Sequence, residues 1–273
     1  MINILHPVSE EIFRVIILLC SVLFLLPGCR SSSKKALVLA GSTSVQPFAE
    51  LLAELYQQRH PGVEINVQGG GSTAGVRAVQ DRICDIGMCS RHLNAAESGL
   101  TAIPIAVDGI VLVVHTTNPV VSLTREQVRA IFSGTVRNWR EFGGANLRIT
   151  VITREEGSGT RTSFEEKVME GAHFASDALV QDSNGAVREI VANDPGAIGY
   201  ISFGLVDERV KTLAIDGVQP TEETIRTHQY PLARDFLFVV AGDSNPLAQS
   251  FIDFVLSPEG QAALAEEGLI RVR

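Results

Sequence analysis

The stretch ALVLAGSTSVQPFAELLAEL, residues 36–55, contains a short apolar run, a Gly/Ser/Thr cluster and an amphipathic segment, in that order. The run Leu37–Ala40 is typical of a buried strand. The apolar residues of the amphipathic segment recur at helical spacing, at Phe48, Leu51, Leu52 and Leu55. A strand, a turn and a helix that lies against a sheet are the repeating unit of an α/β fold, which we therefore predict.

The same alternation continues along the chain, which supports one α/β architecture from Ala36 onward. Further strands are predicted at 63–67, 85–88, 110–115, 148–152 and 196–200. Further helices are predicted at 74–81, around Phe164 and Val168, and after Asn184, which we expect to cap its helix. Thr124 and Gln127 form a capping box, and Pro246 and Pro258 each suit a first helical turn.

The first 28 residues differ in composition from the rest. The uncharged run from Val15 to Leu26 is shorter than the roughly 20 residues of a membrane span but fits the core of a signal peptide. Leu26-Pro-Gly-Cys29 then resembles the acylation site of a bacterial lipoprotein. We therefore predict a lipoprotein signal at 1–28, lipidation of Cys29 and a polar tether at 29–35. A plain secretory signal with an incidental Cys29 is the alternative.

Charge and cysteine usage narrow the class of protein. The formal net charge is −8, and it becomes −7 once residues 1–28 are removed, so a basic nucleic-acid surface is not expected. Cys84 and Cys89 flank a short predicted strand whose ends lie about 16 Å apart, beyond the reach of a disulfide. We expect two buried free thiols.

Three Gly/Ser/Thr clusters each lie between a predicted strand and a predicted helix. They are Gly41-Ser-Thr-Ser44, Gly69-Gly-Gly-Ser-Thr73 and Gly157-Ser-Gly-Thr160, with Arg154 just before the third. Such turns expose unpaired backbone N–H groups at the positive end of the helix dipole, and each hydroxyl adds a donor. One cluster alone is also typical of a helix cap, whereas three in one chain indicate an anion site.

The clusters do not match the common catalytic signatures. No Gly-Lys-Ser/Thr follows at the spacing of a Walker loop, and Gly157-Ser-Gly159 is too short for a Gly-x-Ser-x-Gly elbow. The six His residues lack metal-ligand spacing, so neither a metal nor another cofactor is expected. An enzyme would need an activated nucleophile or a metal pair, and we can place neither.

Five segments together resemble one family, the phosphate-binding proteins of the phosphate-specific ABC importer. They are Gly41–Ser44 with Pro47, Val67–Ser72, Asp85–Gly87 followed by Ser90-Arg91, Arg154 with Gly157–Thr160, and Pro195–Tyr200. The resemblance implies a type II periplasmic binding protein, with two α/β lobes and the anion in the cleft between them. The lobes would comprise 36–111 plus 236–273, and 112–235.

The resemblance also implies a function and its partners. The chain would be a monomer outside the cytoplasmic membrane, on the cell surface or in the periplasm, held by its lipid anchor. It would bind inorganic phosphate and deliver it to the permease and ATPase subunits of an importer. A receptor for sulfate, molybdate or tungstate, and a phosphate-sensing lipoprotein without transport, are the alternatives.

Eleven residues match the family's anion contacts or their neighbours. From the first two loops and the segment after the third strand these are Ser42, Thr43, Ser44, Ser72, Ser90 and Arg91. From the other lobe they are Arg154, Glu156, Ser158, Gly159 and Thr160.

One position departs from the family pattern. Better-known members carry an Asp where this chain has Ser90, and that Asp accepts the proton of hydrogen phosphate. Glu156 is the best remaining acceptor, with Asp108 a weaker candidate. The alternative for Glu156 is a salt bridge that orients Arg154.

Overall fold

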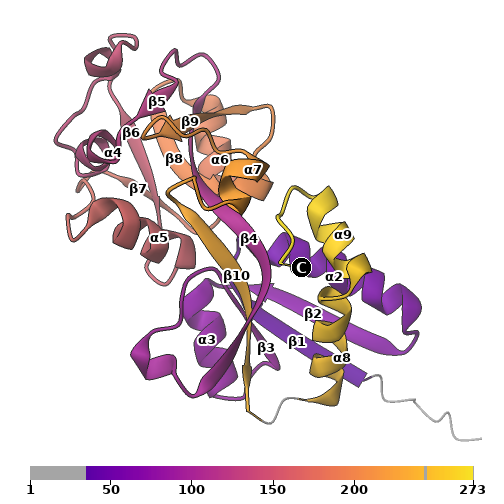
Figure 1. Cartoon of the computed structure of the whole chain (residues 1–273). Coiled ribbons are helices and arrows are strands. Elements are labelled where there is room, and N and C mark those ends of the chain that lie inside the picture. The colour runs from indigo at the N-terminus through magenta and orange to yellow at the C-terminus, as the bar shows by residue number, and fades with distance from the viewer. Residues whose placement is uncertain (1–34, 243–244, 273) are drawn as a thin grey trace, which may run out of the picture. The chain divides into compact units, whose positions relative to one another are not determined.

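The computed structural model describes residues 35–242 and 245–272, in which helices and strands alternate (Figure 1). The strands are β1 Lys35–Gly41, β2 Val63–Gly69, β3 Ile86–Cys89, β4 Leu100–His115, β5 Ser122–Leu123, β6 Thr150–Arg154, β7 Leu179–Gln181, β8 Ala197–Ser202, β9 Val210–Ile215 and β10 Ala233–Ala241. The α-helices are α2 Gln46–Arg59, α3 Ser72–Gln80, α4 Arg125–Phe132, α5 Gly159–Phe164, α6 Asn184–Asn193, α7 Glu222–Arg226, α8 Pro246–Val255 and α9 Pro258–Glu266. Short 3-10 turns lie at Ala95–Glu97, Trp139–Phe142 and Phe203–Leu205, and a π-helical turn, Glu165–Met169, continues α5.

The strands form a mixed sheet. Its main path runs β2-β1-β3-β10-β4-β8-β6-β7, and β9 pairs with β4 and β5. β1 is parallel to β2 and β3, whereas β10 is antiparallel to both β3 and β4. β6 is parallel to β8 and β7. The α/β class predicted from the sequence is confirmed.

The long strand β4 belongs to both ends of this sheet. From Leu100 to Gly109 it pairs with β10, and from Ile110 to His115 it pairs with β8 and β9 (Figure 1). The sequence predicted only the second part, because Pro104 and the polar residues before Ile110 interrupt the apolar run. β4 and β10 therefore carry the chain from one end of the sheet to the other.

Buried apolar side chains gather in two main clusters on either side of that crossing. One includes Leu37, Leu39, Phe48, Phe236 and Phe251 from β1, α2, β10 and α8. The other gathers side chains from the second half of β4 and from α4, β6, α6 and β8, among them Val113, Phe132, Ile152, Val187 and Tyr200. Lys35–Arg273 forms one compact unit, and its division into lobes at 111/112 and 235/236 stays a prediction.

Several local predictions are confirmed. Thr124 caps α4 in a capping box with Gln127, and Pro246 and Pro258 lie in the first turns of α8 and α9. Cys84 and Cys89 are free and buried. Burial raises the pKa of the Cys84 thiol to about 11, so this thiol stays protonated at neutral pH.

The prediction that Asn184 caps α6 is wrong. Ser183 occupies the cap, with extended backbone, and its Oγ accepts a hydrogen bond from the N–H of Ala186 at 3.2 Å. Both residue types cap helices well, so the sequence does not separate them. The consequence is that the Asn184 side chain, as the first residue of the helix, is available elsewhere.

The predicted signal at 1–28, Cys29 and all but the last residue of the 29–35 tether lie outside the described residues. Within residues 35–242 and 245–272, no helix is both long and apolar enough to cross a membrane.

Candidate anion-binding site

The three Gly/Ser/Thr clusters lie where the sequence placed them, between β1 and α2, β2 and α3, and β6 and α5. They are also in contact. The N–H of Gly71 donates to the carbonyl of Gly41 at 2.9 Å, and the N–H of Thr73 donates to the carbonyl of Gly157 at 3.1 Å. The second loop therefore joins the first and third loops, which are over a hundred residues apart in the sequence, at one place. The α-helices that follow the loops direct their N-terminal N–H groups there.

Two glycines allow this close approach. A Cβ on Gly41, whose φ is +137°, would lie 2.2 Å from the carbonyl oxygen of Met88. A Cβ on Gly159 would lie 2.3 Å from Ser72 Oγ and 2.7 Å from Ser90 Oγ. All three distances are too short for a Cβ contact, so glycine fits best where the loops converge.

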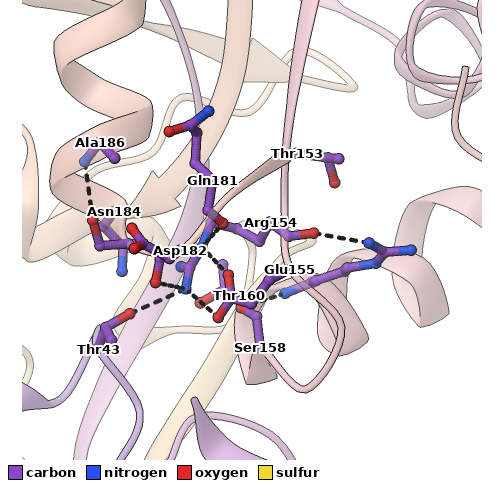
Figure 2. A network of polar contacts seen from close by, with 12 residues as sticks. Thr43, Thr153, Arg154, Glu155, Ser158, Thr160, Gln181, Asp182, Asn184 and Ala186 are labelled. Atoms are coloured by element: carbon purple, nitrogen blue, oxygen red, sulfur yellow. Dashed lines mark hydrogen bonds and ion pairs between the residues drawn. The ribbon is translucent and has the colours of Figure 1, made fainter. Parts of the chain in front are cut away.

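Arg154 is the cation at this point. It ends β6, and its side chain is only 1 % exposed. Its Nε and Nη2 donate to the Glu155 carboxylate at 2.9 Å each, and Nη2 also donates to Thr43 Oγ1 at 3.1 Å (Figure 2). The backbone carbonyls of Gln181 and Asp182 accept from the same guanidinium.

One nitrogen of that guanidinium stays without a partner. Within the part of the chain that the structure describes, nothing accepts a hydrogen bond from the buried Nη1 of Arg154. An unpaired buried donor on a charged group is costly, and native proteins rarely leave one unless a ligand or water completes it. This nitrogen is a buried, charged donor that points to no acceptor among the described residues.

Buried hydroxyls surround the convergence. Ser44 Oγ and Thr160 Oγ1 lie 2.8 Å apart, and Ser42 Oγ donates to Ser90 Oγ at 2.9 Å. Ser72 Oγ accepts from the N–H of Ser90 at 3.0 Å. Buried hydroxyls and the Arg154 guanidinium therefore surround the junction of the three loops.

Ser158 has a different task. Its Oγ accepts from the N–H of Arg161 at 3.3 Å and so caps α5. The structure brings Ser158 and Gly159 to the loop junction, but it uses the Ser158 side chain to begin the helix.

Glu156 is not placed as the sequence suggested. Its side chain is exposed, and the carboxylate that pairs with Arg154 is that of Glu155. The alternative interpretation of Glu156, a salt bridge to Arg154, is therefore wrong, because Glu155 makes that pair and Glu156, beside the turn at Gly157, is exposed. The role of Glu156 in ligand binding stays a prediction.

Arg91 lies beside the second loop but is held by its own carboxylate. Its Nη1 and Nη2 each donate to Glu97 at 2.8 Å, and Nη2 lies 3.4 Å from Thr73 Oγ1. These bonds hold the pKa of Glu97 below its usual value. Arg91 thus fixes the segment after β3 next to the second loop.

Asp108, the weaker candidate for a proton acceptor, is fully occupied. Its Oδ2 accepts from Arg234 Nε and Nη2 at 3.0 and 2.9 Å, and its Oδ1 accepts from the hydroxyl of Ser202 and the N–H of Phe203. Four donors leave no free direction for a ligand proton. Burial raises the pKa of Asp108, and the Arg234 guanidinium opposes that effect.

Two further residues that contact these hydroxyls escaped the sequence analysis. Asn184 Nδ2 donates to Ser44 Oγ at 2.9 Å, and Arg234 Nη1 donates to Thr160 Oγ1 at 2.9 Å. Asn184 looked like a helix cap, and Arg234 lies in an ordinary strand. No motif marks either residue, and Arg234 lies beside Asp235 at the start of β10, before the apolar run of that strand begins.

Tyr200, from the resembling segment Pro195–Tyr200, supports Arg154 from behind. Its hydroxyl accepts from the Arg154 N–H at 3.3 Å and lies 2.7 Å from Thr153 Oγ1. Burial raises the pKa of Tyr200 to about 12, so the phenol remains a neutral hydrogen-bonding group. Among the described residues, no group of three or more His, Cys, Asp or Glu side chains could hold a metal ion.

Comparison with known proteins adds independent information. A family model described as a PBP superfamily domain matches residues 30–259. The phosphate-binding protein PstS of Bacillus subtilis is 32% identical over 243 residues, which cover 87% of this chain and 81% of that protein.

Two solved structures are also similar. A putative phosphate ABC transporter substrate-binding protein from Clostridium perfringens, with bound phosphate, superposes with a TM-score of 0.85 at 39% identity, over 88% of this chain and 100% of the other. An ABC-type phosphate transport receptor from Vibrio cholerae superposes with a TM-score of 0.74 at 38% identity. The match covers 86% of this chain and 99% of the other.

Proposed function

Because the chain belongs to the PBP superfamily, and within it to the PstS phosphate-binding proteins, we propose that it binds inorganic phosphate and delivers it to an ABC importer. The observation that carries the proposal is the buried Arg154 guanidinium with its unpaired Nη1, at the junction of three donor-rich loops. A tetrahedral oxyanion offers acceptors in several directions, which matches donors that arrive from several loops.

The contacts proposed for phosphate come from both sides of the junction. Thr43 and Ser44 lie on one side with Ser72 and Ser90, whereas Arg154, Gly159 and Thr160 lie on the other. Ser42 supports Ser90 through its hydrogen bond, Ser158 caps the helix that begins at Gly159, and Arg91 holds the segment after Ser90 beside the second loop. Glu156 keeps the contact role that the resemblance implies only as a prediction.

The number of donors is sufficient for tight binding. A hydrogen bond to a charged group contributes about 1.5–3 kcal/mol, and micromolar affinity requires about 8 kcal/mol. Four or five such bonds reach that value after part is lost to desolvation and ordering. Bulk attraction is not needed, in keeping with the acidic net charge of −8.

Phosphate is favoured over other oxyanions by the relatives. The protein from Clostridium perfringens contains phosphate, and the Bacillus subtilis protein is named for it. We further propose that the chain acts outside the cytoplasmic membrane as a monomer, held there by lipid on Cys29. The apolar run before Cys29 and the polar residues after it support this location. The partners are then the permease and ATPase subunits of the importer, and the chain itself carries out no catalysis.

Calorimetry of the protein against phosphate, sulfate, arsenate and molybdate tests the proposal. We expect micromolar or tighter binding of phosphate and its analogue arsenate, and binding of sulfate and molybdate that is at least tenfold weaker. Equal or tighter binding of sulfate would assign the chain to another oxyanion.

A further inference from the structure

The site has no free carboxylate to accept a proton from its ligand. Asp108 already accepts four hydrogen bonds, Glu155 is paired with Arg154, and Glu156 is exposed. At neutral pH inorganic phosphate carries at least one proton and sulfate carries none. A protein that selects phosphate must therefore offer some other acceptor, because a ligand O–H that faces only donors is left unpaired.

Six buried residues form a closed ring of hydrogen bonds, which includes the hydroxyls of Ser44 in the first loop and Thr160 in the third. The ring runs Ser44, Thr160, Arg234, Asp108, Ser202, Asn184 and back to Ser44, with links of 2.7 to 3.1 Å. Each of these side chains is at most 4 % exposed. Because the ring is closed, the partners of each side chain restrict the directions of its hydrogens and lone pairs.

Two members of the ring have fixed directions. The backbone N–H of Ser202 donates to Asn184 Oδ1 at 3.1 Å, so the other end of that amide, Nδ2, donates to Ser44. Arg234 has only donors, so Thr160 Oγ1 accepts from it. Ser44 and Thr160 thus each use one lone pair within the ring.

The remaining capacity of the two hydroxyls can be counted. A hydroxyl has one hydrogen and two lone pairs. One hydrogen is used between Ser44 and Thr160, together with one lone pair of the other oxygen. What is left for a ligand is one hydrogen on one oxygen and one lone pair on the other, 2.8 Å away.

Arg234 determines which of the two oxygens keeps the free hydrogen and which keeps the free lone pair. The guanidinium polarises the Thr160 hydroxyl, which makes its hydrogen a stronger donor and its lone pair a weaker acceptor. Ser44 receives only a neutral amide N–H. The favoured arrangement therefore has Ser44 donating to Thr160, Thr160 donating to the anion, and a Ser44 lone pair facing the ligand.

We propose that Ser44 accepts the proton of hydrogen phosphate, and that Asn184 and Arg234 are positioning residues that keep its lone pair and the Thr160 hydrogen directed at the ligand. This inference rests on the proposed function. It gives the site a neutral acceptor for the ligand proton. Sulfate has no proton to donate, so a lone pair on its oxygen would face the Ser44 lone pair.

The test compares phosphate and sulfate affinities of the full chain in detergent by calorimetry. Ser44→Ala should lower the phosphate-to-sulfate affinity ratio by about tenfold, mainly through phosphate, because one acceptor is lost. Thr160→Val, which removes a donor, should weaken both anions and change the ratio by less than about threefold. Asn184→Ala should lower the ratio too, but should add little in a Ser44→Ala background, because it acts through Ser44.

Ser183→Ala is the matched control. It removes the cap of the same helix next to Asn184, so it should lower thermal stability but leave the ratio unchanged and remain additive with Ser44→Ala. If Asn184→Ala does not fold, Arg234→Lys takes its place. Arg234→Lys keeps the charge but loses the planar guanidinium that donates to Asp108 and Thr160 through different nitrogens. It should weaken the binding of both anions, and should add little to the loss already caused by Thr160→Val.

Different results separate the inference from the function. An unchanged ratio in Ser44→Ala, or a ratio that falls in Glu156→Gln instead, would overturn the inference while tight phosphate binding kept the function. Additive effects of Asn184→Ala and Ser44→Ala would remove the positioning role. Failure of the unsubstituted protein to bind phosphate would overturn the proposed function and the inference with it.

Discussion

At the scale of single residues, each buried arginine near the site has a carboxylate of its own. Arg91 pairs with Glu97, Arg154 with Glu155, and Arg234 with Asp108. These pairs offset the charge of each cation, so the site attracts an anion mainly through oriented hydrogen-bond donors. Arg154 differs from the other two because it keeps an unpaired nitrogen for a ligand.

Replacement of Arg154 tests that difference. Arg154→Ala should weaken phosphate binding by at least tenfold, because a charge-assisted contact is lost. Arg77→Ala, at an exposed arginine of α3 near the second loop, is the control and should change affinity by less than about twofold. Calorimetry measures both. A similar loss in the two variants would mean that general charge, not the Arg154 contact, binds the anion.

The Arg91–Glu97 pair makes a prediction about pH. Its bonds lower the pKa of Glu97 from the usual 4.5, so the stabilisation is complete above that value and is lost as the pH falls through the lower pKa of the folded state. Glu97→Gln should therefore be less stable than the unsubstituted protein at neutral pH, and the difference should shrink below about pH 4. Urea unfolding at several pH values measures it. A difference independent of pH would contradict the assignment.

At the scale of elements, the site depends on how closely the third loop approaches the second loop and β3. Gly159→Ala places a Cβ 2.3 Å from Ser72 Oγ, so the loops must separate, and phosphate affinity should fall by at least tenfold. Gly185→Ala is the matched control, since nothing lies within 4 Å of the added Cβ in α6. It should leave affinity unchanged and stabilise the helix by about 0.5–1 kcal/mol. Equal phosphate affinity in the two variants would show that the close approach is not needed.

The elements themselves could largely be predicted from the sequence, because hydrophobic periodicity and caps are local signals. β1, α2, α3 and α4 lie within a few residues of their predicted bounds. The loops of the site were equally visible, since Gly, Ser and Thr between a strand and a helix have a direct physical meaning.

What could not be predicted is which distant side chains meet. The choice between Glu155 and Glu156 depends on the turn at Gly157, and the pairing of Asp108 with Arg234 depends on the antiparallel register of β4 and β10, in which these two residues are partners. Asn184 lies one residue after the helix cap, which is Ser183. Such contacts follow from the assembled sheet and leave no local pattern.

At the scale of the whole molecule, the proposed lipid anchor depends on Cys29. Cys29→Ser removes the thiol that lipid would modify, so it should shift the protein from the membrane fraction to the soluble extracytoplasmic fraction. Fractionation with immunoblotting measures the shift, and Cys84→Ser, at a buried thiol, is the control that should stay with the membrane. A Cys29→Ser protein that remained in the membrane fraction would contradict lipid anchoring.

The central claim is that phosphate binds where the three loops converge on Arg154. A crystal structure of the protein grown with phosphate tests it most directly. We expect the anion between the first two loops and the third, with an oxygen about 2.7–2.9 Å from Arg154 Nη1 and others within reach of Ser44 and Thr160. Phosphate bound at a place that leaves Arg154 Nη1 without a contact would contradict it.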